Sequence, residues 1–431
     1  MKRSQFRLVL VSVAALAVTL LSPFQLQAQY VYVNDNNPGS GSNTATGYVT
    51  VAGPALSIVT GSPFATTSTG YGALPAPNQQ VAISYSASQN CLFVSDPLGN
   101  SAFPTGDFAA FSINPSNGIL TLVGNFNDPS NTSGANKLLP LAIDRRVGFV
   151  YLFAAFTGEG KIAFYKINTS TCQAFWSTST PAVGLSGGSP VVSMAVSKAG
   201  PHVLVVSYGD GSIQSFKIGG GVLTPLAIFN STGFTNQSGR PQSVDISKNG
   251  KFAVFGDARS GVAEVEVAKI LSPSGNLAPT VDYGGPAVAS GVNLGPGIDS
   301  QNVWLSPGMV LGNFYLYITN NGSGQVTTAR MNQTTGVVTN AGTCTAGFTN
   351  PTTLNPLAWS RAAGLHTTKT TTAGVGLAVA EDGTPSSVAL LAIQNASGCT
   401  KEVTSSPFVD LNSNFTFTGL ESIDVFPSRP Y

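Results

Sequence analysis

The sequence predicts an all-β fold, a seven-bladed β-propeller of four-stranded antiparallel blades, on the strength of three observations. A pair of short alternating strands separated by a polar turn recurs seven times along the chain. Two further strand-like segments follow each complete copy, and four short strands in about 50 residues are typical of a propeller blade. The first and last segments are complementary parts of one repeat, which indicates a closed ring.

The repeat is clearest where residues 243–246 (SVDI) lead through a Lys-Asn-Gly turn into residues 252–255 (FAVF). One central residue of each first strand serves as an anchor, and the anchors are Tyr85, Ile143, Val196, Ile246, Leu305, Trp359 and Val425. Successive anchors lie 50 to 66 residues apart. A β-solenoid would show a shorter period, so the spacing favours a propeller.

The ends of the array predict how the ring closes. Residues 30–34 (YVYVN) have the pattern of a second strand with no first strand before it. Residues 422–425 (SIDV) repeat the pattern of a first strand and have no second strand after them. We expect the C-terminal strand to complete the first blade, because this pairing covers two exposed sheet edges.

Composition excludes several other classes. Only 9% of the 431 residues are charged, the net charge is +1, and 42% are hydrophobic. A coiled coil needs many more Glu and Lys residues, and a nucleic-acid-binding protein needs a basic field. The apolar content argues against a disordered chain. A neutral, turn-rich globular protein remains.

Residues 1–28 have the pattern of a secretory signal peptide. A basic start is followed by an apolar run from Leu8 to Leu21, and small residues precede a cleavage point expected after Ala28. A membrane-spanning helix needs about 20 apolar residues, and this run is shorter. We therefore expect residues 29–431 to form a single propeller domain, exported to the periplasm or outside the cell as a monomer, with no integral membrane segment.

These repeats resemble the lactonase-like seven-bladed propellers and the related YVTN-repeat surface proteins of bacteria. The resemblance rests on the Ser-x-x-Gly turns, the second strands at 30–34 and 315–320, and the Ser-Pro-Phe endings at 62–64 and 406–408. It covers the whole chain after residue 28. It implies the propeller fold and, among family members, lactone hydrolases and cycloisomerases. The His, Arg and Glu residues that family cycloisomerases use have no matching local motif in this sequence.

Candidate ligand-binding residues come from the first strands, which line the channel of a propeller. The residue four before each anchor is Val81, Leu139, Val192, Gln242, Gln301, Asn355 and Glu421. This series predicts a channel mouth with an apolar half and a polar half, suited to a small neutral or polar ligand. Arg240 and Asp299 lie close to it in sequence, and Glu421 is the candidate general base. The alternative is that these groups bind only channel water and loop backbone.

Three other polar features have structural interpretations. The residues Asp35, Asp96, Asp210, Asp257, Asn320 and Asp382 follow second strands, where short side chains stabilise turns. Cation binding by some of them is the alternative, since carboxylates suit Ca²⁺. Asp144 is expected in a solvated turn. In the last complete repeat we place the first strand at 357–360 and treat 361–374, with His366, as an inserted loop.

Four cysteines fit two disulfides in an exported protein, with three possible pairings. Aligning the repeats places Cys172 and Cys399 at one equivalent position, Cys91 on the same face, and Cys344 toward the other face. Cys91–Cys172, between adjacent blades, is the least strained pairing in this register. The wide spacing and the two histidines of the chain argue against a metal site.

Two functions follow from these observations. The first is an exported scaffold that binds a small molecule, a glycan or an envelope partner through its channel mouth or faces, with no cofactor and no nucleic acid. The second is a lactone hydrolase or cycloisomerase acting at the mouth, with Glu421 as base and Gln242, Gln301 and Asn355 positioning the substrate.

Overall fold

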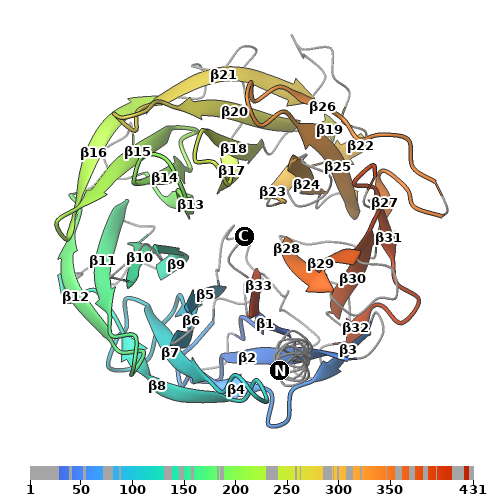
Figure 1. Ribbon diagram of the computed structural model, residues 1–431. Helices are drawn as coiled ribbons and strands as arrows, with labels where there is room; N and C mark the ends of the chain where they lie inside the picture. Colours follow the sequence, from blue (N-terminus) through green and yellow to red (C-terminus); the bar gives the residue numbers. More distant parts are fainter. Residues whose placement is uncertain are drawn as a thin grey trace, which may run out of the picture.

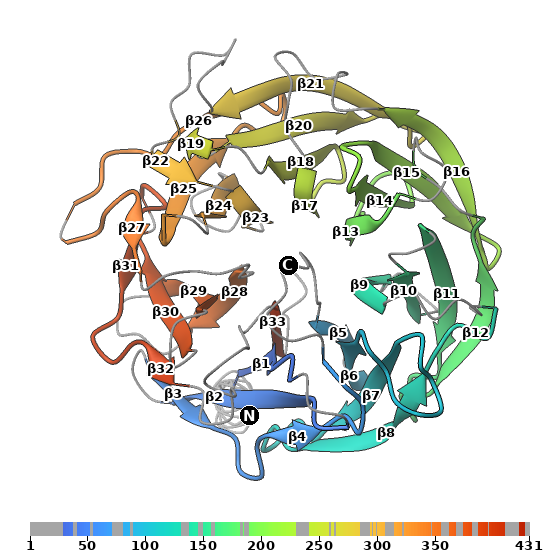
Figure 2. The same ribbon diagram turned by 180° about the vertical axis from the view of Figure 1, so that it is seen from behind.

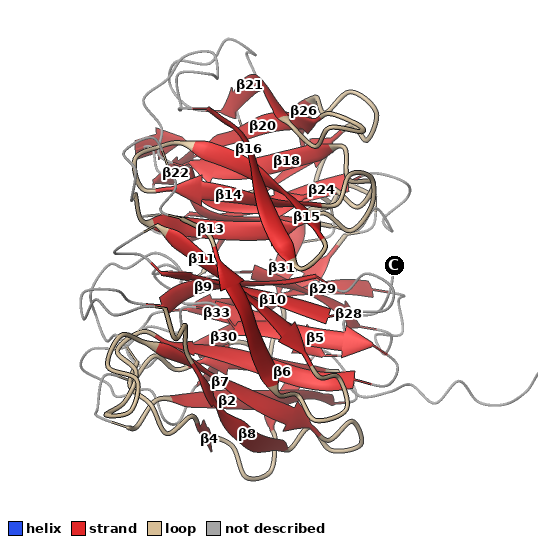
Figure 3. Cartoon of the chain, turned by 90° about the vertical axis from the view of Figure 1, so that its left-hand side faces the viewer, coloured by secondary structure: helices blue, strands red, loops and turns tan. Residues whose placement is uncertain are grey.

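The computed structural model is a ring of seven antiparallel sheets around a central channel axis, so the predicted seven-bladed propeller is confirmed (Figure 1). The same ring is seen from behind in Figure 2, and the side view in Figure 3 shows the strands crossing the thickness of the disc. The structure describes residues 29–426 except 38–40, 52–54, 71–80, 87–88, 131–137, 145–149, 157–159, 182–183, 185–188, 230–240, 258–259, 263, 285–293, 295, 299, 307–313, 321–322, 346, 355–361, 368–373, 382–386, 395 and 410–421. The expected signal peptide lies outside these residues. The described part of the chain contains no helix with the length and hydropathy needed to cross a membrane.

We label the blades A to G and give their strands from the channel outward. Blade A has β33 (Ser422–Phe426), β1 (Tyr30–Asn34), β2 (Thr44–Val51) and β3 (Ala55–Ile58), with β4 (Phe64–Ala65) also paired to β2. Blade B has β5 (Val81–Ser86), β6 (Gln89–Asp96), β7 (Asp107–Ile113) and β8 (Leu120–Phe126). Blade C has β9 (Leu138–Asp144), β10 (Val150–Phe156), β11 (Lys161–Ile167) and β12 (Ala174–Ser179). Blade D has β13 (Val191–Val196), β14 (Val203–Tyr208), β15 (Ile213–Gly219) and β16 (Val222–Phe229).

The second half of the ring follows the same order with small additions. Blade E has β17 (Pro241–Ile246), β18 (Phe252–Asp257), β20 (Glu264–Ile270) and β21 (Leu277–Gly284). Blade F has β23 (Ser300–Leu305), β24 (Phe314–Asn320), β25 (Gln325–Met331) and β26 (Val338–Asn340), with β27 (Thr352–Thr353) also paired to β25. Blade G has β28 (Ala362–Thr367), β29 (Gly374–Glu381), β30 (Ser387–Ile393) and β31 (Thr400–Glu402), with β32 (Phe408–Val409) also paired to β30. A separate two-stranded ribbon joins β19 (Ser260–Val262) to β22 (Pro296–Ile298).

The C-terminal strand closes the ring as predicted. β33 pairs antiparallel with β1, from Tyr30 opposite Phe426 to Asn34 opposite Ser422. β33 is the innermost strand of blade A and lies between β1 and the centre of the ring (Figure 1). Blade A is therefore built from both ends of the described chain.

The first strand of blade G lies later in the chain than we expected. β28 spans Ala362–Thr367, inside the segment that the sequence pattern assigned to an inserted loop, and His366 pairs with Val375 of β29. The segment that forms the strand is the one nearer to β29 in sequence, and a short connection closes at a lower entropic cost than a long one. The predicted strand at 357–360 falls outside the described residues.

Seven hydrophobic clusters fill the seven contacts between neighbouring blades, which we call seams. Alternate residues of each second strand enter different seams. Tyr30 and Tyr32 of β1 pack in the seam with blade B, whereas Val31 and Val33 pack in the seam with blade G. Because both faces of a blade are buried, the second strands are continuous apolar runs rather than alternating ones.

A repeated contact brings the turn between the third and fourth strands of one blade against the second strand of the blade before it. Gly118 of blade B has a φ of 74°, and a β-carbon there would lie 2.3 Å from the Tyr30 ring. Gly336 has a φ of 76°, and a β-carbon there would lie 2.6 Å from the Phe252 ring. Tyr32 adds a hydrogen bond of 2.6 Å from its hydroxyl to the Gly118 carbonyl. Only glycine combines this backbone conformation with such a close ring.

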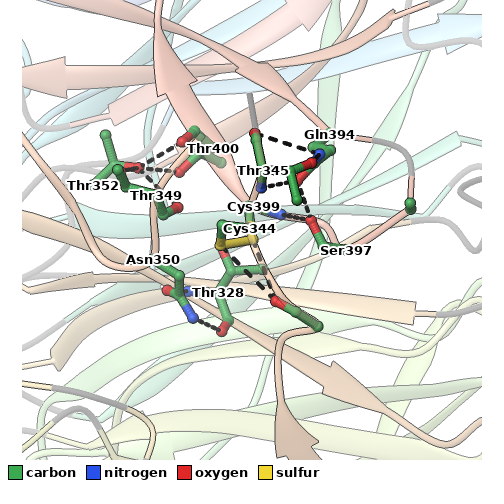
Figure 4. Close-up of a disulfide and its surroundings, with 12 residues drawn as sticks. Thr328, Cys344, Thr345, Thr349, Asn350, Thr352, Gln394, Ser397, Cys399 and Thr400 are labelled. Carbon is green, nitrogen blue, oxygen red and sulfur yellow. Dashed lines mark hydrogen bonds between the residues drawn. A yellow bond between two sulfur atoms is a disulfide. The ribbon is translucent and has the colours of Figure 1, made fainter. Parts of the chain in front are cut away.

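Two disulfides join neighbouring blades. Cys91 is bonded to Cys172, the pairing expected from the repeat register, and Cys344 is bonded to Cys399. Cys344 therefore lies beside the turn that carries Cys399, and our placement of Cys344 toward the other face was wrong. The reason is that β26 ends at Asn340, so the chain leaves the blade before Cys344. Figure 4 shows this bridge next to the hydrogen-bonded pair Thr345 and Gln394.

The two equivalent cysteines differ by one position in the turn. The Cys172 amide donates to the Asn168 carbonyl, and the same bond in blade G runs from Gly398 to Gln394. Cys172 has a φ of 60° and Gly398 a φ of 74°. Cys172 thus takes the place of the turn glycine, and Cys399 is the residue after it, which corrects the alignment made from sequence.

We predict that Gly118→Ala lowers the free energy of unfolding by about 3 kcal/mol, from the left-handed backbone and the clash with Tyr30. Gly220→Ala is the matched control, because Gly220 has a φ of 60° but nothing within 4 Å of an added β-carbon. The control isolates the backbone cost of about 1 kcal/mol. Urea denaturation measures both, and equal losses would show that the ring contact contributes nothing.

Candidate functional site

The innermost strands of four consecutive blades carry a bulge at the same place. The extra residues are Val192 in β13, Gln242 in β17 and Gln301 in β23, each inserted between two paired positions. In β9 the bulge includes Leu139. These are four of the seven positions that the repeat alignment assigned to the channel mouth. A bulge residue is unpaired in the ladder, and bulges are frequent next to functional sites.

The predicted mouth residues differ in whether the structure describes them. Gln242 and Gln301 lie in described strands of adjacent blades, at matching register positions. Arg240, Asp299, Asn355 and Glu421 lie outside the described residues. Val81 begins β5, which pairs with β6 without a bulge. The described structure therefore brings Gln242 and Gln301 to equivalent places.

The β19–β22 ribbon adds a feature at this edge that the sequence did not predict. β19 follows the second strand of blade E, and β22 comes shortly before the first strand of blade F. Ser260 pairs with Ile298, so the ribbon ties the two connections together between the blades that carry Gln242 and Gln301. The three-residue strands contain Gly and Pro, which explains why no strand pattern was visible.

Side chains of one innermost strand satisfy backbone amides of the next. The Ser193 hydroxyl accepts a 3.2 Å hydrogen bond from the Val244 amide, and the Ser243 hydroxyl accepts one of 2.9 Å from the Val303 amide. Asp245 accepts a bond of 2.8 Å from the Leu305 amide. These residues fix the relative height of blades D, E and F at the channel. The signal in the sequence for the two serines is their shared position, three residues before the anchors Val196 and Ile246.

A pair of buried carboxylates lies where β6 ends and β7 begins. Asp96 and Asp107 are opposite each other in the register of the two strands, and both are fully buried. Asp96 Oδ1 accepts hydrogen bonds from Asn43 at 2.6 Å and from Thr66 at 2.9 Å. Both donors belong to blade A, so Asp96 joins two blades rather than only stabilising its own turn, as its position in the sequence predicted. Asp210 does keep that turn role, accepting from the Ser212 amide at 2.9 Å.

Asp107 is held by a second group of donors. Its Oδ2 accepts bonds from Ser68 at 2.7 Å, from Asn125 at 2.9 Å and from Asn100 at 3.2 Å. Burial raises the pKa of Asp107 to about 6, although the donors lower it. Burial, together with the facing charge of Asp107, raises the pKa of Asp96 well above its usual range.

Asp144 is also buried, which overturns the expectation of a solvated turn. It ends β9 and contacts the His202 imidazole that precedes β14 in the next blade. Only 2% of the Asp144 side chain is exposed, against 29% for His202. The contact links blades C and D. Among the described residues, no group of three or more His, Cys, Asp or Glu side chains is placed to hold a metal ion.

Comparisons with known proteins support the fold. No family profile and no curated protein match the sequence. A protein from Lactobacillus plantarum has a similar structure, with a TM-score of 0.64, 13% identity, and coverage of 93% of this chain and 99% of that one. The periplasmic gluconolactonase PpgL of Pseudomonas aeruginosa has a TM-score of 0.52 and 17% identity. The match covers 72% of this chain and 80% of that one. A functionally unknown protein from Desulfotomaculum acetoxidans has a TM-score of 0.54 and 14% identity. The match covers 87% of this chain and 95% of that one. At these identities, the likeness shows a shared fold.

We predict that Ser243→Ala destabilises the protein by about 1–2 kcal/mol, because it leaves the Val303 amide without its acceptor. Hydrogen exchange of the Val303 amide should accelerate by more than that of other β23 amides. Ser116→Ala is the control, since Ser116 is exposed and, among the described residues, its hydroxyl donates within its own turn to Asn114. Unchanged exchange at Val303 would contradict the role assigned to Ser243.

Proposed function

We propose that this protein is an exported ligand-binding propeller that holds a small neutral polar molecule, of the sugar or sugar-lactone class, at the channel mouth between blades E and F. The observation that carries the proposal is the pair of bulges that gives Gln242 and Gln301 the same position in adjacent innermost strands. Amide side chains both donate and accept hydrogen bonds, which suits hydroxyl and carbonyl groups.

The composition of the mouth supports a neutral ligand. Val192 and Leu139 occupy the matching bulges of blades D and C, so one side of the mouth is aliphatic in sequence and the other carries amides. Small-molecule sites commonly combine apolar lining with a few polar groups that fix orientation. The two disulfides support export, because such bonds persist in oxidising compartments.

Lactone hydrolysis is the second candidate function. It is favoured by the similarity of the fold to the periplasmic gluconolactonase PpgL, and by the resemblance of the repeats to lactonase-like propellers. In this proposal Glu421 acts as general base toward a water molecule, and Gln242 and Gln301 orient the lactone carbonyl. Glu421 immediately precedes β33, the strand that closes the ring.

We predict that D-glucono-1,5-lactone or D-glucose binds the purified chain from residue 29 onward, as measured by titration calorimetry. Gln242→Leu with Gln301→Leu should weaken that binding at least about tenfold, which corresponds to about 1.4 kcal/mol. Gln173→Leu is the matched control, because Gln173 is exposed and follows the turn between β11 and β12. That turn lies at the end of blade C opposite the channel mouth. Equal binding by the double variant and the control would place the ligand elsewhere. Absence of binding by both probes would contradict a sugar-type ligand.

We predict for the second candidate that a panel of lactones is hydrolysed with proton release, and that Glu421→Gln abolishes the release. Glu402→Gln is the control, since Glu402 lies on the outermost strand of blade G. Hydrolysis that persists in Glu421→Gln would keep the activity and remove Glu421 as its base. Absence of hydrolysis across the panel would leave the binding function.

A further inference from the structure

The carboxylates Asp96 and Asp107 are buried, and neither has a cationic partner among the residues that the structure describes. The sequence contains no Lys, Arg or His between Arg7 and Lys137, a stretch that includes every described strand of blades A and B except β33. β33 (SIDVF) carries no basic residue. No ion pair to either carboxylate occurs in the described part of the chain. Two buried carboxylates without a countercharge strongly disfavour double ionisation.

The hydrogen bonds are divided unequally between the oxygens of each carboxylate. Every donor to Asp96 reaches Oδ1, and every donor to Asp107 reaches Oδ2. The remaining oxygens, Asp96 Oδ2 and Asp107 Oδ1, are buried and have no hydrogen-bond partner among the described residues. The two residues are directly opposite each other in the register of β6 and β7, so their side chains leave the same face of the sheet as neighbours.

The surrounding amides are oriented as donors. The Asn100 oxygen accepts from the Ala102 amide at 2.9 Å, and the Asn43 oxygen accepts from the Asn37 amide at 2.8 Å. These bonds fix the NH₂ groups toward the carboxylates, so the amide oxygens are turned away. A hard cation such as Ca²⁺ needs six to eight oxygen ligands, and the amide oxygens of Asn43 and Asn100 are not directed toward the carboxylates.

We propose that Asp96 and Asp107 share one proton in the folded protein and form a pH-sensitive lock on the seam between blades A and B. One carboxyl group donates through the shared proton, and its neighbour accepts as a carboxylate. The other titratable side chains on the described strands and turns of these blades are Asp35, Asp128, Asp424, Tyr30, Tyr32, Tyr48 and Tyr85. None of these becomes positively charged, so none supplies the missing countercharge.

The lock has a defined dependence on pH. The folded-state pKa values of the pair are raised above the unfolded value near 3.9. The folded protein therefore binds more protons than the unfolded chain above about pH 4. The stabilisation is complete below the unfolded pKa and is lost as the pH rises through the folded values, so the seam weakens toward alkaline pH.

The test uses Asp96→Asn, which keeps the acceptor toward Asn43 and Thr66 and places an NH₂ group where the shared proton lies. We expect the urea midpoint of the wild type to fall between about pH 5 and about pH 8, and the midpoint of Asp96→Asn to fall much less and to exceed that of the wild type at the higher pH. Asp107→Asn should behave alike, which keeps the test valid if one variant folds poorly. The double variant should be less stable than either single variant, because two NH₂ groups then face each other.

Two controls distinguish a shared proton from a general loss of stability and from a bound cation. Asp210→Asn removes an exposed carboxylate after the second strand of blade D and should keep the wild-type pH dependence. Infrared spectroscopy at neutral pH should show a protonated carboxyl band that is absent in Asp96→Asn. If Asp96→Asn is less stable than the wild type at both pH values, the shared proton is wrong. A rise in the wild-type midpoint with CaCl₂ that EDTA reverses, and that Asp96→Asn lacks, would overturn the proposal in favour of a cation site.

Discussion

The pairing of β33 with β1 is the contact on which the ring depends. It joins residues 30–34 to residues 422–426, nearly the whole length of the chain apart. Without it, β1 would present an exposed edge at the channel, and blade A would lack its innermost strand. Every other blade is built from strands that follow one another along the chain, so blade A alone couples the two ends and holds the remaining six blades in a closed circle.

Closure also explains the composition of the seams. In a closed ring each blade has two buried faces, so neighbouring residues of one second strand serve different seams, as Phe153 and Ala154 of β10 do. Few charged side chains are tolerated in such strands, which is consistent with a chain that is only 9% charged. Some of the buried or partly buried polar groups, including Ser243, Asp245 and Asp96, bond to the adjacent blade. They set how blades align rather than how each blade folds.

The fold was predictable from sequence because its signal is repeated, whereas only the positions of the site residues, and not their bulges or the buried carboxylate pair, could be predicted. Seven copies of one pattern indicated the blade number, and the orphan strands at 30–34 and 422–426 indicated the closure. The first strand of blade G was misplaced because residues 357–360 and 362–367 both have an apolar pattern. The segment with the shorter connection to β29 forms the strand. The Asp96–Asp107 pair was missed because it depends on a match between two strands and on donors from blade A, such as Asn43. The bulges at Gln242 and Gln301 depend on backbone register, which composition does not encode.

The absence of basic residues from Leu8 to Asn136 has a consequence for how this protein is degraded. Proteases that cleave after Lys or Arg find no site in the loops that join β1 to β8, although exposed loops are the usual points of attack. Their first cleavable bond after Arg7 follows Lys137, at the entry to blade C. A digest with such an enzyme leaves β1 to β8 as one long fragment, still tethered to blade C through the Cys91–Cys172 bridge. The part of the ring that carries the carboxylate pair and receives the closing strand is thus also the longest part of the chain without a site for these proteases.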